Sequence, residues 1–542
     1  MASEKLLSVA LDFGTSCSGY AFSFQHSKEN ISTSRWAGSD YIKAPTSILF
    51  NPQKEFNSFG FEAEDKYAEL SKNGTHKDWY LFKQFKLVLI KEKKLSRSTV
   101  INDVSGRKML AMDVFSAGIQ FLKDNVIENL RCQWTIIRHT DIQWVLTVPS
   151  IWDDAAKQFM RLAANKAGIP NESLMLVLEP DAAAMSPSFS SICAVGEKCM
   201  ILDCGGGTID VSIMEKNNRG SVDSIYRPTG GVWGGTKVDD AFQEFLITHF
   251  GMDRFLRMEK NDVLLVQRSF ETAKKKAQEP SARKVAIWLP LTLREDIDQL
   301  PIRQSIVGDK LTLNADQVVS FFQKPVSCIV SHLQKIVIDP EVYGLKYIIM
   351  AGGFSESEIL QSAIQSNFPS IDVRVVEDPS SAVLKGAVVL GHNPKIIEIK
   401  RSAYTYGIKV MTGFIEKNHD KSKLTVIDGE TKCKDVFDKV IGINETIQIN
   451  ETKVERIYGP AFFRQKEGII AIYRSKNINP RYVTDAGCEQ IGHLVVNMPD
   501  LTGEKNRQVK VTTYFGETEL QAEAVDKTTG RKYTAFFEFL GY

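Results

Sequence analysis

Two short turns carry the residue types that bind a polyphosphate. The first, Gly14-Thr15-Ser16-Cys17, follows an apolar run that ends in Asp12. The second, Gly205-Gly206-Gly207-Thr208, follows an apolar run that ends in Asp203. Glycine lets backbone N–H groups approach an anion closely, and the hydroxyl groups add further donors. Asp12 and Asp203 could hold a hydrated Mg²⁺, which needs only one or two carboxylates beside the phosphates.

Each turn is expected to join the two strands of a hairpin. Strand-like residues flank the turns at 6–24 and 198–214, and the recurrence of one design along the chain predicts two related lobes. Two facing hairpins would clamp a polyphosphate from both sides, so phosphoryl transfer would depend on positioning and charge neutralisation. The Walker sequence GxxxxGK[ST] does not occur, which argues against the P-loop class.

The elements that position these turns follow from the hydrophobic pattern. A strand at 143–148 ends at Pro149, and a buried strand at 346–351 leads into Gly352-Gly353. After residue 391, strand-like stretches alternate with turns, and no long helix is predicted. We therefore expect an α/β protein with two lobes, followed by an all-β domain.

Composition and charge narrow the classes of function. The 542 residues include 67 basic and 66 acidic side chains, a balance that gives no reason to expect a nucleic-acid partner. No apolar stretch approaches the roughly 18 residues of a membrane span, and no secretory signal is recognised, so a cytoplasmic location is predicted. The cysteines lack metal-finger spacing and are expected to be reduced thiols. They are Cys17, Cys132, Cys193, Cys199, Cys204, Cys328, Cys433 and Cys488.

An ordered set of motifs resembles the 70-kDa heat-shock protein family (Hsp70), within the actin-like ATPase superfamily. The matching segments are 11–16, 146–150, 178–184, 201–213, 234–239 and 350–354. The resemblance implies a nucleotide-binding ATPase domain over 1–393, a linker over 394–403 and a β-sandwich over 404–542. The ATPase domain would have ribonuclease-H-like lobes, with lobe I at about 1–192 and 378–393 and lobe II at about 193–377.

The resemblance also implies roles for individual residues, with ATP or ADP and Mg²⁺ as the cofactors. The catalytic residues would be Asp12, Lys86, Glu179, Asp203, Thr208 and Asp210, and Asp12 and Asp203 would bind the metal through water. Lys83 remains an alternative to Lys86 as the essential lysine. Pro149 matches a position tied to signalling between domains. The nucleotide-binding residues would be Gly14, Thr15, Ser16, Cys17, Gly205, Gly206, Gly207, Thr208, Gly234, Gly235, Glu271, Lys274, Lys275, Gly352, Gly353, Phe354 and Glu356.

Several positions depart from the family pattern. Glu356 stands where the family usually has an arginine that packs on adenine, so an anion replaces a planar cation that can stack. The linker carries a charge at Glu398. The family's helical lid and acidic cochaperone-binding tail have no counterpart in this sequence. These departures point to an atypical, lid-less branch with altered adenine recognition.

The resulting hypothesis is an ATP-binding protein that hydrolyses ATP slowly. Its nucleotide state would regulate how the β-domain binds a client peptide or protein, whose identity the sequence does not predict. One alternative is a nucleotide-bound scaffold or signalling protein that does not cycle. Another is a sugar or metabolite kinase of the same superfamily, which would need an acid acting as a base on a hydroxyl and would not predict the terminal hairpin at 523–531.

Overall fold

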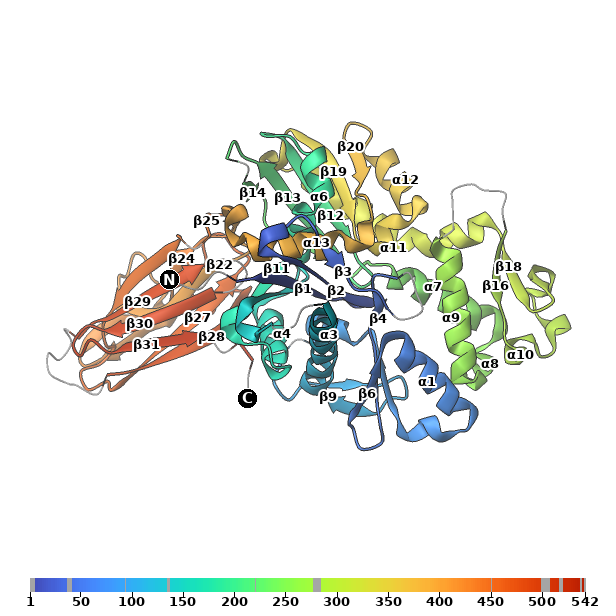
Figure 1. Cartoon of the computed structure of the whole chain (residues 1–542). Coiled ribbons are helices and arrows are strands. Elements are labelled where there is room, and N and C mark those ends of the chain that lie inside the picture. Colours follow the sequence, from blue (N-terminus) through green and yellow to red (C-terminus); the bar gives the residue numbers. More distant parts are fainter. Residues whose placement is uncertain are drawn as a thin grey trace.

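Two α/β lobes face each other, and a β-sandwich lies beside them (Figure 1). The computed structural model describes residues 5–36, 41–92, 94–133, 137–219, 221–275, 284–449, 451–498, 507–515, 520–536 and 539–540. Within these ranges, no helix is both long enough and apolar enough to cross a membrane. The arrangement confirms the predicted fold class of an α/β part followed by an all-β part.

Lobe I is built on a sheet with the strand order β11-β10-β1-β2-β3, and β4 pairs with β2. The strands are β1 (Leu7–Phe13), β2 (Cys17–Phe24), β3 (Ser32–Thr33), β4 (Ala44–Pro45), β10 (Ile142–Val148) and β11 (Leu174–Leu178). β1 and β2 form an antiparallel hairpin, whereas β10 runs parallel to both β1 and β11. Every residue of β1 is buried, as expected for a strand covered on both faces. Helices α3 (Ala111–Gln133) and α4 (Asp154–Lys166) cover one face.

Lobe II repeats this arrangement, as the recurring hairpin predicted. Its sheet has the order β14-β13-β12-β19-β20, with β15 paired to β13. The strands are β12 (Lys198–Cys204), β13 (Ile209–Lys216), β14 (Val222–Ser224), β15 (Thr229–Gly231), β19 (Leu345–Ala351) and β20 (Asp372–Val375). Again an antiparallel hairpin, β12–β13, is followed by parallel neighbours. Its outer face packs against α7 (Thr236–Phe250), α11 (Ala315–Val337) and α12 (Glu358–Asn367).

Two helices lie between the sheets and hold the lobes together. They are α5 (Glu179–Ala184) and α13 (Pro379–His392), and they share one apolar core with residues from both sheets. The two helices cross closely at Gly386, where an added Cβ would overlap the backbone carbonyl of Ala182. This crossing therefore requires glycine.

Smaller elements extend each lobe outward. In lobe I they are β5 (Ser47–Phe50), β6 (Phe56–Phe59), α1 (Gly60–Lys72), β7 (Tyr80–Lys83), α2 (Val88–Lys91), β8 (Val100–Asn102), β9 (Lys108–Leu110) and α6 (Pro187–Ile192). In lobe II they are α8 (Met252–Arg257), α9 (Lys260–Lys275), β16 (Val285–Trp288), α10 (Leu291–Arg294), β17 (Ile306–Val307) and β18 (Lys310–Leu313). Arg268 of α9 pairs with Glu64 of α1 at 3.1 Å, so the outer parts of the lobes touch.

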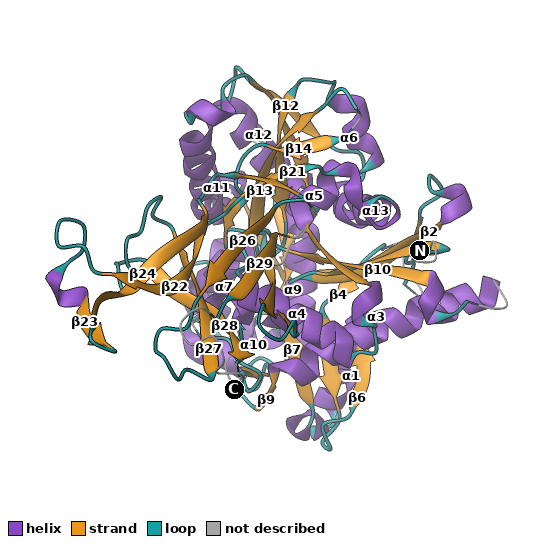
Figure 2. Ribbon diagram, turned by 90° about the vertical axis from the view of Figure 1, so that its left-hand side faces the viewer, coloured by secondary structure: helices purple, strands orange, loops and turns teal. Residues whose placement is uncertain are grey.

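The C-terminal part is a sandwich of two antiparallel sheets, β23-β24-β22-β27-β28 and β26-β29-β30-β31. Its strands are β22 (Thr405–Gly413), β23 (Leu424–Ile427), β24 (Glu430–Ile441), β26 (Lys453–Tyr458), β27 (Glu467–Ser475), β28 (Cys488–Asn497), β29 (Val509–Phe515), β30 (Leu520–Asp526) and β31 (Lys532–Phe536). Apolar residues from both sheets form its core. In Figure 2, β23 and the adjoining end of β24 project away from the rest of the molecule.

The sandwich contacts lobe I at several places, and two of them lie near its start and near its end. Near its start, β21 (Ile399–Arg401) pairs with β25 (Thr446–Gln448), and Lys400 forms an ion pair of 2.8 Å with the buried Asp181 of α5. Near its end, the backbone N–H groups of Phe539 and Leu540 donate to Gln158 Oε1 of α4 at 2.8 and 3.2 Å. The Leu540 side chain completes the core of lobe I.

Cys193 and Cys199 form a disulfide, which corrects the prediction that all cysteines are reduced thiols. The chain turns back between α6 and β12, and this turn brings the two Cα atoms to 6.7 Å. That separation suits a disulfide, whereas the sequence prediction had considered only CxxC and metal-finger spacings. The other six cysteines do not form disulfides within the described residues.

Candidate functional site

The two glycine-containing turns, one from each lobe, lie against each other. A Cβ added to Gly206 would overlap the side chain of Ser16, and one added to Gly207 would lie 2.5 Å from Thr15 Oγ1. Only glycine therefore lets the second turn come this close to the first. Cys17 begins β2 with an exposed thiol beside the same turn. The predicted phosphate-binding residues of the two lobes are thus brought together.

The other predicted glycine pairs adjoin the second turn. Gly235 N–H donates to Gly205 O at 3.1 Å, and Thr236 N–H donates to Gly206 O at 2.8 Å. Gly352 lies directly against the carboxylate of Asp203. Gly234, which precedes the start of α7, is packed equally tightly against the turn. In contrast, a Cβ at Gly353 would meet nothing within 4 Å.

Phe354 follows these glycines in a single helical turn that spans Gly353–Glu356. Its ring is buried, and it would lie 3.5 Å from a Cβ on Gly235. The ring thus fills the space beside the glycine segment that precedes α7.

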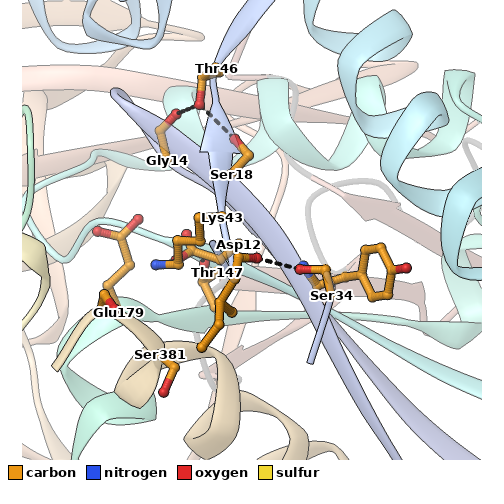
Figure 3. Close-up of polar contacts among 12 residues, drawn as sticks. Asp12, Gly14, Ser18, Ser34, Lys43, Thr46, Thr147, Glu179 and Ser381 are labelled. Carbon is orange, nitrogen blue, oxygen red and sulfur yellow. Dashed lines mark hydrogen bonds and ion pairs between the residues drawn. The ribbon is translucent and has the colours of Figure 1, made fainter. Parts of the chain in front are cut away.

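Four buried carboxylates and two lysines gather beneath the turns, and Figure 3 shows part of this group. The carboxylates belong to Asp12, Glu179, Asp203 and Asp210. Lys43 Nζ lies 2.6 Å from Asp12 Oδ2, and Lys86 Nζ lies 3.0 Å from Glu179 Oε1. Four acidic side chains and two basic side chains therefore lie together in a buried region. This excess of acidic groups favours the binding of a further cation.

Asp12 has its charge stabilised by its neighbours. Burial alone would raise the pKa of this carboxyl, but the charges of Lys43 and Lys86 lower it below the ordinary value. Hydrogen bonds from Lys43 and from the Thr147 hydroxyl, at 3.0 Å, act in the same direction. Asp12 is thus held as an anion at the end of β1.

In Asp203 and Glu179, by contrast, the effects that raise the pKa outweigh those that lower it. Burial raises the pKa of Asp203 well above its usual range, and the charges of Glu179 and Asp210 raise it further. No ammonium or guanidinium group of the described residues forms an ion pair with Asp203. Burial also raises the pKa of Glu179 to about 7, against the lowering effect of Lys86. Either carboxylate would gain from a nearby cation.

Asp210 connects the site to the segment after β10. One of its oxygens accepts hydrogen bonds from Ser150 N–H, Ser150 Oγ–H and Ile151 N–H, at 2.5, 2.7 and 3.2 Å. Its second oxygen is buried and has no hydrogen-bond partner among the described residues. Burial raises the pKa of Asp210, although these bonds and the nearby Thr208 hydroxyl lower it. The unpartnered oxygen could accept a bond from a bound ligand or its water.

The two candidate lysines occupy different places. Lys86 is buried next to Glu179, and its ammonium lies 4.9 Å from the centre of the Trp152 ring. Lys83 pairs instead with Glu64 at 2.8 Å and reaches Gln267 of lobe II at 3.4 Å. The structure therefore places Lys86 within the carboxylate group and Lys83 at the outer contact between the lobes.

The predicted adenosine-side residues form an internal ion-pair cluster. Lys274 lies between Glu271 and Asp239, at 2.6 and 2.7 Å, and its side chain is nearly buried. The side chain of Lys275 lies outside the described residues. Glu356 ends its helical turn half-exposed, close in the chain to Gly352 and Phe354.

The geometry fits a magnesium nucleotide. The two turns lie so close that a Cβ on Gly206 or Gly207 would overlap Ser16 or Thr15, and a buried oxygen of Asp210 has no hydrogen-bond partner among the described residues. Within the described ranges, no group of three or more His, Cys, Asp or Glu side chains could hold a metal directly. Mg²⁺ does not need such a group, because it keeps several waters and takes one or two carboxylates with the phosphates. Asp12 and Asp203 would supply those carboxylates.

Sequence reasoning missed four residues of the site: Lys43, Thr147, Ser150 and Trp152. Thr147 and Ser150 lie within the motif at 146–150, so their positions carried a signal. Trp152 lies two residues after the end of that motif. Lys43 carried none, because its contact with Asp12 depends on the pairing of β4 with β2.

Comparison with known proteins supports the resemblance of the motifs. The family model described as Hsp70 protein matches residues 80–491. Heat shock 70 kDa protein 12A of Homo sapiens is 30% identical over 99% of this chain and 92% of its own length. Heat shock 70 kDa protein 12B of Homo sapiens is 31% identical over 98% and 91%. The 12A protein of Mus musculus is 31% identical over 99% and 92%. The similarity thus covers nearly the full chain.

Proposed function

Because this chain belongs to the Hsp70 family, we propose that it hydrolyses ATP slowly and that its nucleotide state regulates partner binding. Family membership makes the chain an Hsp70-like ATP-binding protein. In this proposal residues 1–393 form the ATPase domain, 394–403 the linker and 404–542 the domain that binds a client peptide or protein. The proposal is supported chiefly by one segment, residues 149–154, that contacts both the site and the sandwich.

The first half of this segment is hydrogen-bonded to a carboxylate of the site. Ser150 and Ile151 donate three hydrogen bonds to one oxygen of Asp210. A phosphate or metal-bound water at the other oxygen would alter the charge and position of this carboxylate. Because buried networks of this kind are rigid, the backbone of residues 150–151 would move with it.

The second half of the segment contacts the sandwich. Arg474 of β27 pairs with Asp153 at 3.1 Å and approaches Asp154 at 3.9 Å. Tyr406 of β22 donates to Asp154 at 3.4 Å, and the Arg474 guanidinium lies over the Tyr404 ring at 4.9 Å. Asp153 also caps α4 by accepting from the Ala156 N–H group. A shift of residues 150–151 would therefore change the contacts that hold the sandwich in its docked position.

This linkage provides the differential contacts that ligand-driven regulation needs. A nucleotide can shift the docking equilibrium only as far as it favours one state over the other. Each group of residues in the site would have its own role toward the nucleotide. The glycine turns would donate backbone N–H groups to phosphates, and Asp12 and Asp203 would hold Mg²⁺, which neutralises phosphate charge. Lys86 and Glu179 would orient the attacking water.

Calorimetry and binding measurements test the proposal in two steps. Titration of the full chain with ATP, with ADP and with buffer alone should show binding of both nucleotides, and absence of binding would overturn it. Affinity for a permanently unfolded probe, carboxymethylated α-lactalbumin, should then differ between the ATP-bound, ADP-bound and nucleotide-free protein. Arg474→Met should make the three probe affinities equal while ATP binding persists. Equal affinities in the wild type would contradict nucleotide regulation.

The ion pair of Lys43 with Asp12 favours a second candidate, a scaffold that holds nucleotide and turns over very slowly. Here Asp203→Asn should leave partner binding unchanged while it abolishes the residual hydrolysis. Under the main proposal the same substitution should remove the difference between nucleotide states. Analysis of the products distinguishes both candidates from a kinase, since free phosphate indicates hydrolysis and a phosphorylated sugar indicates a kinase.

A further inference from the structure

Lys43 places a fixed positive charge on the carboxylate where a metal ion would be expected. Its Nζ lies 2.6 Å from Asp12 Oδ2, and its side chain is 18% exposed. Asp203 is the other carboxylate beneath the two turns that is expected to bind the metal. It has no ion-pair partner among the described residues. The two carboxylates are therefore not equivalent, because one already has a counter-ion from the chain itself.

The chain holds Lys43 in place through the strand that follows it. β4 pairs with β2 so that Ala44 lies opposite Ser18 and Pro45 opposite Cys17. Thr46 then ties this strand to the first turn: its hydroxyl group donates to Gly14 O at 2.8 Å, and its N–H group donates to Ser16 O at 2.8 Å. Figure 3 shows Thr46, Gly14 and Ser18 above Lys43 and Asp12.

The aliphatic part of the Lys43 side chain packs beside Gly19. A Cβ on Gly19 would lie 3.1 Å from Lys43 Cγ, so glycine at this position leaves room for the aliphatic chain. The ammonium group is thus anchored from both ends: the backbone is fixed to the first turn, and the charge is fixed to Asp12. The Lys43 side chain is already ordered, so it has little conformational entropy left to lose when a ligand binds beside the ion pair.

We propose that Lys43 serves as a tethered cation that takes over part of the role of Mg²⁺ at Asp12, so that nucleotide binding depends only weakly on the metal. This inference rests on the proposed nucleotide site. The ammonium neutralises Asp12 before any ligand arrives, and it stands beside the first turn, where the phosphates would lie. Mg²⁺ would then be held mainly at Asp203, and its removal would leave one phosphate-side cation in place.

The first experiment uses the full chain without nucleotide. Thermal unfolding is compared in EDTA and in MgCl₂ for the wild type, Lys43→Met and Lys43→Arg. The wild type and Lys43→Arg should show little response to Mg²⁺. Lys43→Met uncovers the Asp12 carboxylate, so its melting temperature should fall in EDTA and recover when Mg²⁺ is added. A Lys43→Met protein whose response to Mg²⁺ equals that of the wild type would overturn the inference, whether or not nucleotide binds.

The second experiment measures ATP binding by calorimetry in the same two buffers. Wild-type ATP affinity should change by less than about tenfold between EDTA and Mg²⁺, and Lys43→Met should widen this ratio by at least about tenfold. Lys510→Met is the matched control, because Lys510 pairs with Glu455 at 2.8 Å in the sandwich. It should keep the wild-type ratio, and an unchanged ratio in Lys43→Met would overturn the inference. If the wild type binds no ATP in Mg²⁺, the proposed function fails, while the unfolding experiment still decides the role of Lys43.

Discussion

Glu179 is a buried carboxyl whose charge state changes with pH near neutrality. Its pKa is raised from 4.5 to about 7 in the folded protein, first by burial and then by Asp210 and Asp12. The folded chain therefore keeps a proton that the unfolded chain releases above pH 4.5. The stability that this proton contributes is fully present below the unfolded pKa and is lost as pH rises through the folded pKa.

We accordingly predict that the nucleotide-free protein loses up to about 3 kcal/mol of unfolding free energy between acidic and neutral pH. Urea unfolding at a series of pH values measures this loss. Glu179→Gln cannot ionise at this position, so it should remove that part of the pH dependence. If the unfolding free energy of the mutant changes with pH as steeply as that of the wild type, the pH dependence comes from other groups.

Lys86 and Lys83 form a matched pair for mutation, since they lie three positions apart in different surroundings. Lys86→Met removes the cation beside Glu179, and ATP hydrolysis should fall by about 100-fold or more. Lys83→Met breaks the outer contacts with Glu64 and Gln267, so hydrolysis should stay within about threefold of the wild type. Single-turnover measurements with bound ATP test both variants. The reverse result would identify Lys83 as the essential lysine.

At the residue scale, the sequence predicted the groups that stand at the ends of strands. Asp12 and Asp203 could be recognised because each precedes a turn of small residues, and that local pattern fixes their position. Lys43 could not be recognised, because nothing within its own neighbourhood brings it to Asp12. The ion pair between Lys274 and Glu271 was likewise missed. The sequence had suggested that both faced a nucleotide, not that they neutralise each other.

At the scale of elements, the crossing of α5 and α13 is a close helix contact that only glycine permits. Gly386→Ala places a methyl group against the carbonyl of Ala182, so the helices must move apart. We expect a loss of about 1–3 kcal/mol in unfolding free energy, the usual cost of overpacking. Gly413→Ala is the control, because a Cβ there meets nothing within 4 Å and should change stability by less than about 0.5 kcal/mol. Chemical denaturation compares the two variants, and equal stabilities would contradict a close crossing.

Long elements with clear periodicity were predictable, and short ones were not. Both hairpins and the strand at 143–148 follow from apolar runs bounded by turn residues. β4 contains only Ala44–Pro45, too few residues for any periodic signal, yet it positions Lys43. The disulfide of Cys193 and Cys199 was also missed, because it depends on the turn between α6 and β12 rather than on a spacing rule.

At the scale of the whole molecule, the buried pair of Lys400 and Asp181 holds the sandwich against lobe I. Asp181 is 1% exposed, and Lys400 is the cation paired with it among the described residues. Removal of Lys400 would leave this charge buried without compensation, a change that typically costs about 3–5 kcal/mol. We expect Lys400→Met to weaken docking, so that small-angle scattering shows a larger radius of gyration.

Limited proteolysis provides a second measurement of the same effect. The residues between His392 and Thr405 should be cut faster in Lys400→Met than in the wild type, because undocking exposes them. Lys395→Met is the control, since Lys395 is an exposed lysine in the same segment. Equal cleavage rates for wild type and Lys400→Met would show that the ion pair does not determine docking.

The packing of Leu540 in lobe I also has a consequence for synthesis on the ribosome. Lobe I begins at the first strand of the chain, yet its core includes a side chain from the far end of the sandwich. Domains usually fold in the order in which they are translated. Here the earliest-made lobe acquires its last core residue only after residue 540 has left the exit tunnel. Until then, the surface of α4 that receives Leu540 would be open to molecular chaperones or to premature aggregation.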